Sequence, residues 1–190
     1  DHDRISLSNI HRQSLFNEKD LNQPKVKIAK KKLKKINSIT KIKIFNYKLN
    51  KSNFQKIIKD YDYIIDGTDN FESKFLINDL SLKYKKFLVT GAISKFDGHI
   101  FTFNFNNKKE PCLKCFYQTE PSDDILNCEN EGIMGPVAGI TGSIQAMEVL
   151  KKILKLSEKL NNKILILDLI NLNFRKVEFN KKNNCICKNY

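Results

Sequence analysis

Tyr63-Ile-Ile-Asp66-Gly-Thr-Asp69-Asn70 is the segment from which the architecture can be inferred. Its first three residues have the length and apolar character of a short buried strand, and turn-forming polar residues follow at once. Residues 71–84 then repeat apolar side chains at helical spacing, and residues 87–90 are typical of a second buried strand. A strand, a helix and a strand in succession predict a parallel pair with a crossover helix, in which ligands bind beyond the carboxyl ends of the strands.

The alternation of strands and helices continues on both sides of this segment. Pro24 suits the first turn of a helix, where its missing N–H leaves nothing unpaired. Before this segment we predict a helix over 24–37, a strand over 41–47 and a short helix capped by Asn50 or Ser52. After it we predict a helix over 135–156, and residues 164–167 form an apolar run of the length of a strand. The second half of the chain, which begins at 100–105, is expected to be less regular. We therefore expect one α/β domain over residues 1–190, with a Rossmann-like, mainly parallel sheet.

A second polar segment, Asp1-His-Asp-Arg-Ile-Ser-Leu-Ser-Asn-Ile-His-Arg12-Gln13, opens the chain. We expect it to form the end of a strand and the loop after it, as we do for residues 66–70. Because the carboxyl ends of parallel strands share one edge of a sheet, both segments are predicted to contribute to one site. Arg12 carries a planar guanidinium that suits phosphate oxygens, and Asp69 offers the carboxylate that Mg²⁺ prefers.

All five cysteines lie in the second half of the chain. Cys112 and Cys115 form a C-x-x-C pair, a spacing that presents two thiolates to one tetrahedral Zn²⁺. The C-terminal C-x-C pair, Cys185 and Cys187, is the best candidate for the other two ligands. A redox-active C-x-x-C is the competing interpretation, but Cys112 follows Pro111 and lacks a strand-to-helix setting. The sequence therefore favours a zinc-bearing second half with a structural site.

Taken in order, the first segment, Pro24-Lys25, residues 66–70 and the C-x-x-C pair resemble the HesA/MoeB/ThiF family from residue 1 to about residue 187. Members of that family adenylate the C-terminal Gly-Gly of ubiquitin-like sulfur-carrier proteins, a reaction related to that of ubiquitin-activating enzymes. The resemblance implies binding of ATP with Mg²⁺, attack of the carrier carboxylate on the α-phosphate, a structural Zn²⁺ and a homodimer. It implies a carrier for molybdopterin or thiamine synthesis, with sulfur entering from a separate donor protein.

The resemblance also implies roles for single residues. Arg12 and Lys25 are expected to stabilise charge on the phosphates, and Asp69 to hold Mg²⁺. Asp66 is expected to tie the loop by hydrogen bonds, and Asn70 either to cap the next helix or to contact ATP. The residues implied to contact the nucleotide are Asp1 at the ribose, Ser8, Asn9, Arg12, Lys25, Asp69 and Asn70.

Cys128 is left over from the predicted zinc site and lies before the helix expected at 135–156. In part of the family the matching cysteine takes up the activated carrier, and in other members it is dispensable. A thiolate attacks an acyl-adenylate well when the pKa of the thiol is lowered. Two interpretations of Cys128 therefore stay open, a catalytic nucleophile and a plain loop cysteine.

The family's first strand and Gly-rich phosphate loop have no counterpart in this sequence, which contains no G-x-G-x-x-G. We therefore expect the domain to be N-terminally truncated and this piece alone to be almost inactive. The alternative from another class is a non-catalytic, zinc-stabilised binding module that docks a carrier without ATP turnover. A coding sequence that extends upstream into a strand and a Gly-rich turn favours the enzyme.

The composition limits the other classes of function. The net charge is +13, yet only three of the 34 basic residues are arginines. The Lys-rich run at 25–35 surrounds apolar positions at helical spacing, so its lysines are expected to form a solvated face rather than a nucleic-acid site. These apolar positions are Val26, Ala29, Leu33 and Ile36. No run approaches the roughly 20 apolar residues of a membrane helix, and nothing resembles a signal peptide, so we expect a cytoplasmic protein.

Overall fold

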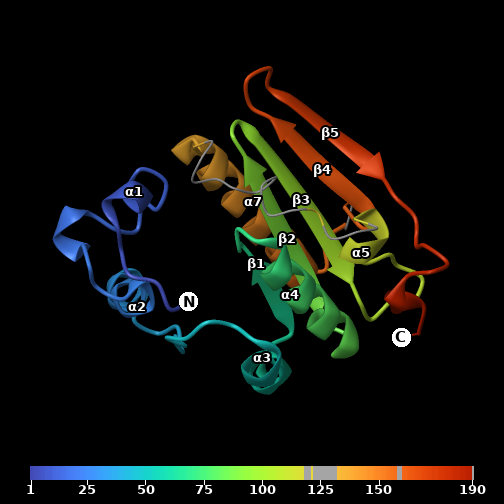
Figure 1. Ribbon diagram of the computed structural model, residues 1–190, viewed down its shortest axis with the longest axis horizontal. Helices are drawn as coiled ribbons and strands as arrows, with labels where there is room; N and C mark the ends of the chain where they lie inside the picture. The colour runs from blue at the N-terminus through green and yellow to red at the C-terminus, as the bar shows by residue number, and fades with distance from the viewer. Residues whose placement is uncertain (118–120, 122–131, 158–159, 190) are drawn as a thin grey trace. The chain divides into compact units, whose positions relative to one another are not determined.

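The computed structural model describes residues 1–117, 121, 132–157 and 160–189. The chain forms two compact units, Asp1–Leu49 and Asn50–Tyr190 (Figure 1). The polar segment at 1–13 belongs to the first unit, whereas residues 66–70 and the four cysteines predicted to bind zinc belong to the second.

The first unit contains helix α2 (Lys25–Ile36), which confirms the helix predicted at 24–37. Pro24 is its N-cap residue and pairs with Arg4 in an isolated antiparallel bridge. Two shorter helices precede α2, namely α1 (Leu7–Ile10) and η1 (Glu18–Asp20). Residues 1–13 were predicted as the end of a strand and a loop, and the strand part is wrong, because Arg4 forms an isolated bridge and a helical turn follows.

The apolar positions at helical spacing on α2 form a stripe that is exposed at its C-terminal end. Leu33 and Ile36 are 40% and 79% exposed, whereas Ile28, outside the predicted stripe, is buried. Residues that come before α2 in the sequence contact its first turn, where the backbone N–H of Lys25 donates a hydrogen bond to the carbonyl of Asp3. A helical face is buried only where another segment covers it, so burial falls on the N-terminal half of α2.

The strand predicted at residues 41–47 is also wrong, because these residues form no regular secondary structure. A β-strand persists only when a neighbouring strand pairs with its backbone N–H and C=O groups. None of the strands that the structure describes pairs with this segment. The carbonyl of Phe45 instead accepts a hydrogen bond from the N-terminal ammonium group at 3.2 Å.

The described strands of the second unit form a five-stranded sheet in the order β1-β2-β3-β4-β5. They are β1 (Tyr63–Asp66), β2 (Phe87–Ser94), β3 (Asp97–Asn104), β4 (Lys163–Asp168) and β5 (Asn173–Glu178). As predicted, β1 and β2 are parallel, and helix α4 (Phe71–Lys83) joins them. The other described pairs are antiparallel, so the prediction of a mainly parallel sheet is wrong. Residues 95–96 and 169–172 form hairpin connections, which are too short for the crossover that parallel strands need.

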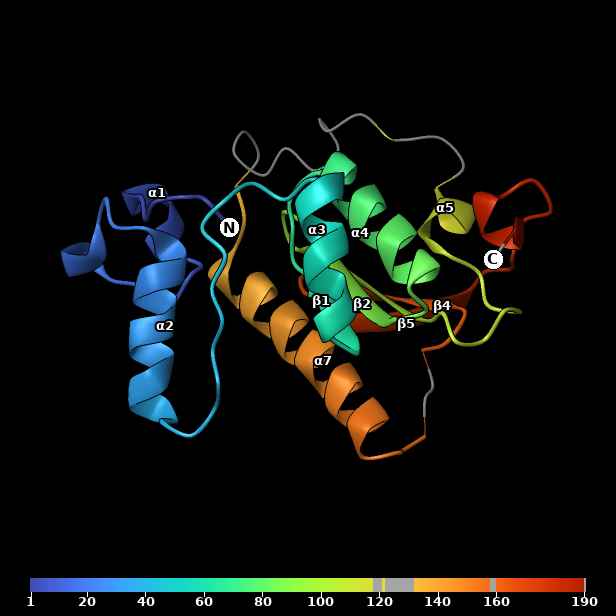
Figure 2. The same cartoon turned by 90° about the horizontal axis from the view of Figure 1, so that it is seen from below.

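Helices cover both faces of this sheet (Figure 2). Helix α4 packs on β1 and β2, and α7 (Gly135–Ile153) packs on β2 and β3 from the other side. Glycines allow the close approach of α7, because a Cβ atom at Gly91 would lie 2.8 Å from the Gln145 side chain and one at Gly98 would meet Thr141. One buried core cluster is made of Phe87, Val89, Ile100, Leu160, Leu165 and Leu167.

The remaining described helices are short. Helix α3 (Lys51–Ile57) begins after Asn50, whose side chain accepts a hydrogen bond from the backbone N–H of Asn53, so Asn50 is the cap of the two considered. The others are η2 (Ile58–Asp60), α5 (Leu113–Phe116) and η4 (Ile186–Asn189). Within the described ranges, no helix has both the length and the apolar character needed to cross a membrane.

Candidate functional site

The candidate site begins where β1 ends. Asp66 is 1% exposed, and both oxygens of its carboxylate accept hydrogen bonds. Oδ1 accepts from the backbone N–H and from the hydroxyl of Thr68, at 2.8 and 2.7 Å. Oδ2 accepts from the hydroxyl of Thr90 on β2 and from Nζ of Lys74 on α4, the latter at 3.2 Å. Asp66 therefore ties the loop to two neighbouring elements, as predicted.

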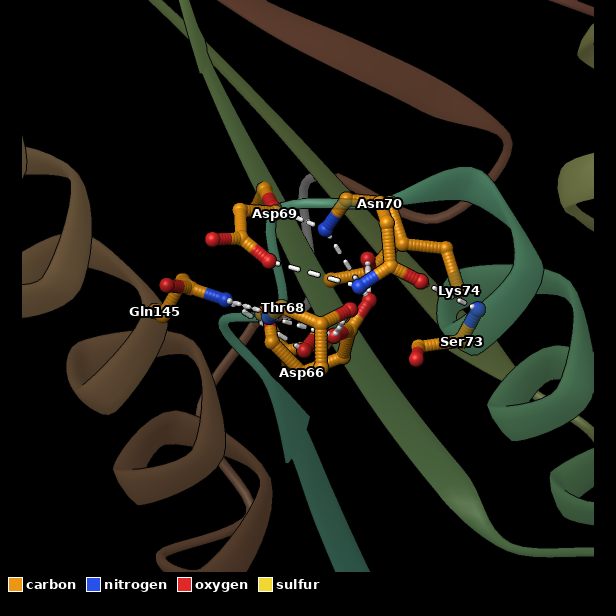
Figure 3. A network of polar contacts seen from close by, with 10 residues as sticks. Asp66, Thr68, Asp69, Asn70, Ser73, Lys74 and Gln145 are labelled. Atoms are coloured by element: carbon orange, nitrogen blue, oxygen red, sulfur yellow. Dashed lines mark hydrogen bonds and ion pairs between the residues drawn. The ribbon is translucent and has the colours of Figure 1, made fainter. Parts of the chain in front are cut away.

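The loop leads directly into α4, whose N-cap residue is Asn70. The side chain of Asn70 accepts a hydrogen bond from the backbone N–H of Ser73 at 2.8 Å, which confirms the predicted cap. Asp69 lies between the anchored residues, is exposed, and accepts a hydrogen bond from Nδ2 of Asn70 at 3.3 Å (Figure 3). A solvent-facing carboxylate of this kind fits Mg²⁺, which takes one or two protein carboxylates and otherwise water or phosphate oxygens.

Lys74 lies beside the candidate site and was not identified from the sequence. Its side chain is 3% exposed, and its Nζ donates to the carbonyl of Gly91 at 2.5 Å as well as to Asp66. The sequence did contain a signal, because Lys74 lies on the buried face of α4 with Phe71 and Phe75. A lysine at a core position needs a partner of opposite charge or a set of acceptors.

Gln145 of α7 is a second residue that was missed. Its Nε2 donates to the backbone carbonyls of Asp66 and Val89, at 2.8 and 3.4 Å. These bonds join the end of β1 and the adjacent part of β2 to the helix on the opposite face of the sheet from α4 (Figure 3). The carbonyls come from residues far away in the sequence, so no local pattern identifies Gln145.

Five of the residues predicted to contact the nucleotide lie in the first unit, namely Asp1, Ser8, Asn9, Arg12 and Lys25. Lys25 is paired there, with its Nζ 2.9 Å from Oδ2 of Asp3. The hydrogen bond from Lys25 holds the pKa of the Asp3 carboxyl below its ordinary value. The exposed carboxylate of Asp1 accepts a hydrogen bond from the backbone N–H of Asp3 at 2.8 Å.

The segment around α1 places the other three residues. Nη1 of Arg12 donates to the carbonyl of Ser8 at 2.8 Å, a bond that closes the turn at the end of α1. The hydroxyl of Ser8 lies 2.9 Å from that of Ser6. Asn9 bonds to this turn through its carbonyl, which accepts from the backbone N–H groups of Arg12 and Gln13. Ser8, Asn9 and Arg12 therefore share one local structure.

The four cysteines predicted to bind zinc lie together in the second unit. All four sulfurs lie within 4.8 Å of one another, with 3.5 Å between Cys112 and Cys185 and 3.4 Å between Cys115 and Cys187. A tetrahedral site with Zn–S bonds of about 2.3 Å places its sulfurs roughly 3.8 Å apart, so the cluster fits Zn²⁺. The C-x-C pair therefore presents both of its sulfurs despite the short spacing.

The acid–base chemistry of the cluster also fits a cation. Burial, reinforced by the neighbouring sulfurs, raises the pKa of Cys112 far above its ordinary value, and burial raises the pKa of Cys187 to about 12. Burial acts in the same direction on Cys115, but hydrogen bonds, including one from the backbone N–H of Lys182 at 3.4 Å, lower its pKa overall. Four thiolates this close repel one another, and the positive charge of a bound Zn²⁺ would offset this repulsion and keep the sulfurs deprotonated.

The first cysteine pair is attached to α4. Asn78, which is fully buried, accepts a hydrogen bond from the backbone N–H of Leu113 at 2.9 Å, and Lys114 pairs with Asp79 at 2.6 Å. Helix α4 therefore also supports α5, which contains Cys115 and has Cys112 as its N-cap residue. Cys128, the candidate nucleophile, lies outside the described residues.

The chain matches the model of the ThiF family over residues 1–189. It is 31% identical over 187 residues to the sulfur carrier protein adenylyltransferase of Thermus thermophilus, a match that covers 96% of this chain and 69% of that protein. It is 34% identical over 190 residues to a probable molybdopterin-synthase adenylyltransferase of Gracilaria tenuistipitata var. liui, a match that covers 100% of this chain and 53% of that protein.

Among solved structures, that of E. coli MccB with ATP is similar with a TM-score of 0.83 at 19% identity, covering 100% of this chain and 58% of that one. At this identity the similarity shows a shared fold. The chain thus spans between 53% and 69% of the length of these three proteins. The match of the family model to nearly every residue shows that the chain belongs to the ThiF family.

Proposed function

We propose that the protein is an ATP-dependent adenylyltransferase that activates the C-terminal Gly-Gly carboxylate of a ubiquitin-like sulfur-carrier protein. The observation that carries this proposal is the loop at the end of β1, where a buried and fully paired Asp66 presents the exposed Asp69. The substrate is inferred from two relatives, which are named a sulfur carrier protein adenylyltransferase and a probable molybdopterin-synthase adenylyltransferase. The second name favours molybdopterin synthesis over thiamine synthesis.

Each candidate residue has a proposed role in this reaction. Arg12 and Lys25 bind phosphate oxygens and stabilise the charge that develops when the carboxylate attacks the α-phosphorus. In this proposal the ammonium group of Lys25 binds the phosphate oxygens and also the carboxylate of Asp3. Asp69 holds Mg²⁺, which neutralises charge on the phosphates. The further nucleotide contacts proposed are Asp1 at the ribose, Ser8, Asn9 and Asn70.

The four-cysteine cluster is proposed to hold a structural Zn²⁺. Four thiolates complete a tetrahedral coordination shell and leave no open position for substrate, which is typical of a structural site. The ion would join the C-terminal turn to the segment around α5. Its proposed contribution is the stability of this part of the second unit rather than the chemistry on ATP.

The rival function is a binding module that docks the carrier without ATP turnover. Asp69 argues against it, because the tail of the carrier ends in a negative carboxylate and an exposed acidic residue repels such a group unless a cation lies between them.

The family resemblance further supports a homodimer and a separate sulfur donor protein. We propose that residues 1–190 are the larger part of one adenylylation domain that acts in the cytoplasm.

ATP labelled in the α-phosphate tests the proposed reaction. We expect the full-length protein to transfer the label to a carrier that ends in Gly-Gly, and to give none with a matched carrier that lacks the last glycine. ATP labelled in the γ-phosphate should leave the carrier unlabelled, because pyrophosphate departs. Label from the γ-phosphate would indicate a kinase, and a carrier that binds but stays unlabelled would favour the binding module.

We also propose that the Cys128 thiolate attacks the acyl carbon of the adenylate, which forms a thiol-labile thioester with the carrier and releases AMP. Cys128→Ser is then expected to leave exchange of pyrophosphate into ATP intact and to abolish the conjugate, because an unactivated hydroxyl is a poor nucleophile at neutral pH. Non-reducing gels with and without dithiothreitol detect the conjugate. If the serine variant supports sulfur transfer at the wild-type rate, Cys128 is a plain loop residue and the donor attacks the adenylate directly.

A further inference from the structure

Lys74 carries a buried charge that the proposed reaction does not use. It lies in the first turn of α4, with its side chain 3% exposed. Its ammonium group has two partners, the carbonyl of Gly91 at 2.5 Å and Oδ2 of Asp66 at 3.2 Å. Lysine side chains are almost never buried without such partners, because removal of the charge from water is costly. The buried ion pair between Lys74 and Asp66, three residues before the proposed Mg²⁺ ligand Asp69, therefore needs a functional explanation.

The partner of Lys74 controls the path of the loop. Oδ1 of Asp66 binds both the backbone N–H and the hydroxyl of Thr68, a local turn that fixes the backbone immediately before Asp69. On the other side, Asn70 is fixed by its bond to the first turn of α4. The exposed carboxylate of Asp69 thus projects from a backbone that is anchored on both sides (Figure 3).

We propose that Lys74 is a positioning residue for the carboxylate of Asp69. Its ammonium group and the hydroxyl of Thr90 hold Oδ2 of Asp66, and this keeps Oδ1 turned toward Thr68. Without the ammonium group, Asp66 is a buried carboxylate that has lost its counter-charge, and rotation or entry of water replaces the ordered contact. The inference rests on the proposed role of Asp69 and adds a residue that touches neither ATP nor Mg²⁺.

Mg²⁺ dependence separates positioning from mere support of the fold. In the full-length protein, Lys74→Met is expected to raise the Mg²⁺ concentration for half-maximal carrier-dependent exchange by about tenfold or more, as when a residue that orients a metal ligand is removed. The KM for the carrier should stay unchanged. Lys74→Arg, which keeps the charge, should stay within about threefold of wild type. A folded Lys74→Met protein with wild-type Mg²⁺ dependence would overturn the inference.

A second measurement does not depend on activity. Amide hydrogen exchange at Thr68 reports its bond to Asp66, and its protection is expected to fall about tenfold in Lys74→Met and to recover in Lys74→Arg. Protection that survives in Lys74→Met contradicts the positioning role even if the proposed reaction is correct. Absence of any exchange of pyrophosphate in the wild-type protein defeats the proposed reaction, whereas the amide measurement still decides the role of Lys74.

A milder variant covers the case in which Lys74→Met does not fold. Thr90→Val removes the other donor to Oδ2 of Asp66 and keeps the shape of a buried strand residue. It is expected to shift the Mg²⁺ dependence and the protection of Thr68 in the same direction as Lys74→Met, by a few-fold. A folded Thr90→Val protein that matches the wild type in both measurements would show that Oδ2 of Asp66 need not be held.

Discussion

Alanine at Asp69 is expected to lower the exchange of pyrophosphate into ATP by on the order of 10³-fold, because the substitution removes the carboxylate proposed to hold Mg²⁺ at the phosphates. The fold should survive, since Asp69 is exposed and the anchors at Asp66 and Asn70 are untouched. Carrier-dependent exchange by the full-length protein, the melting temperature and the zinc content are to be measured on the same preparation.

Asp62→Ala is the matched control for this variant. Asp62 is also exposed and lies directly before β1, but it has no part in the proposed reaction. Its substitution by alanine changes the net charge as Asp69→Ala does, so exchange should stay at the wild-type rate. Retained exchange in a folded Asp69→Ala protein contradicts the Mg²⁺ assignment, and an equal loss in both variants points to a general effect of charge.

Serine at Cys112 is expected to remove a Zn²⁺ ion that the wild-type protein binds at about one equivalent per chain, the stoichiometry of a site with four thiolates. Structural zinc sites have apparent binding free energies of about 10–16 kcal/mol, and much of that is available to folding. Metal analysis after gel filtration gives the stoichiometry. Cys128→Ser is the matched control, since Cys128 is the one cysteine that was not predicted to bind zinc, and this variant should retain the metal.

Chelation should loosen the C-terminal turn and leave the sheet intact. The core around Val89, Ile100 and Leu167 is buried without help from the metal, whereas residues 182–189 are joined to α5 through the cysteines. Hydrogen exchange is expected to rise at 182–189 and to stay slow in β2. An equal zinc content in Cys112→Ser and wild type, or no zinc in either, would contradict the site.

The sequence predicts those elements whose pattern is local. The order of β1, α4 and β2 was predicted correctly, because two short apolar runs flank a longer segment typical of a helix. The burial predicted for β1 is wrong, since Tyr63 and Ile65 are 37% and 52% exposed. Strand β5 was not predicted, since all of its residues are exposed and its pairing with β4 forms only once the chain has folded. Residues 41–47 show the converse, because alternating Ile and Lys suit a strand but no described strand pairs with them.

In the candidate site, too, features with a local sequence pattern were predicted, and features that depend on distant contacts were not. The four cysteines were predicted as a group because few residue types bind zinc, and the structure brings their sulfurs together. Asn70 was identified as a possible cap from its position before the helix. Lys74 and Gln145 were missed, since their partners are an acidic residue on another element and backbone carbonyls of β1 and β2. Such contacts exist only once the sheet has formed.

Carrier-dependent exchange of labelled pyrophosphate into ATP measures, in the reverse direction, the proposed activation of a carboxylate at the end of a Gly-Gly tail. With the full-length protein, we expect rapid exchange in the presence of Mg²⁺ and a Gly-Gly carrier. We expect background exchange without the carrier or with the carrier shortened by one glycine. Exchange that proceeds equally without a carrier, or none with a carrier that binds tightly, would contradict the proposed activation.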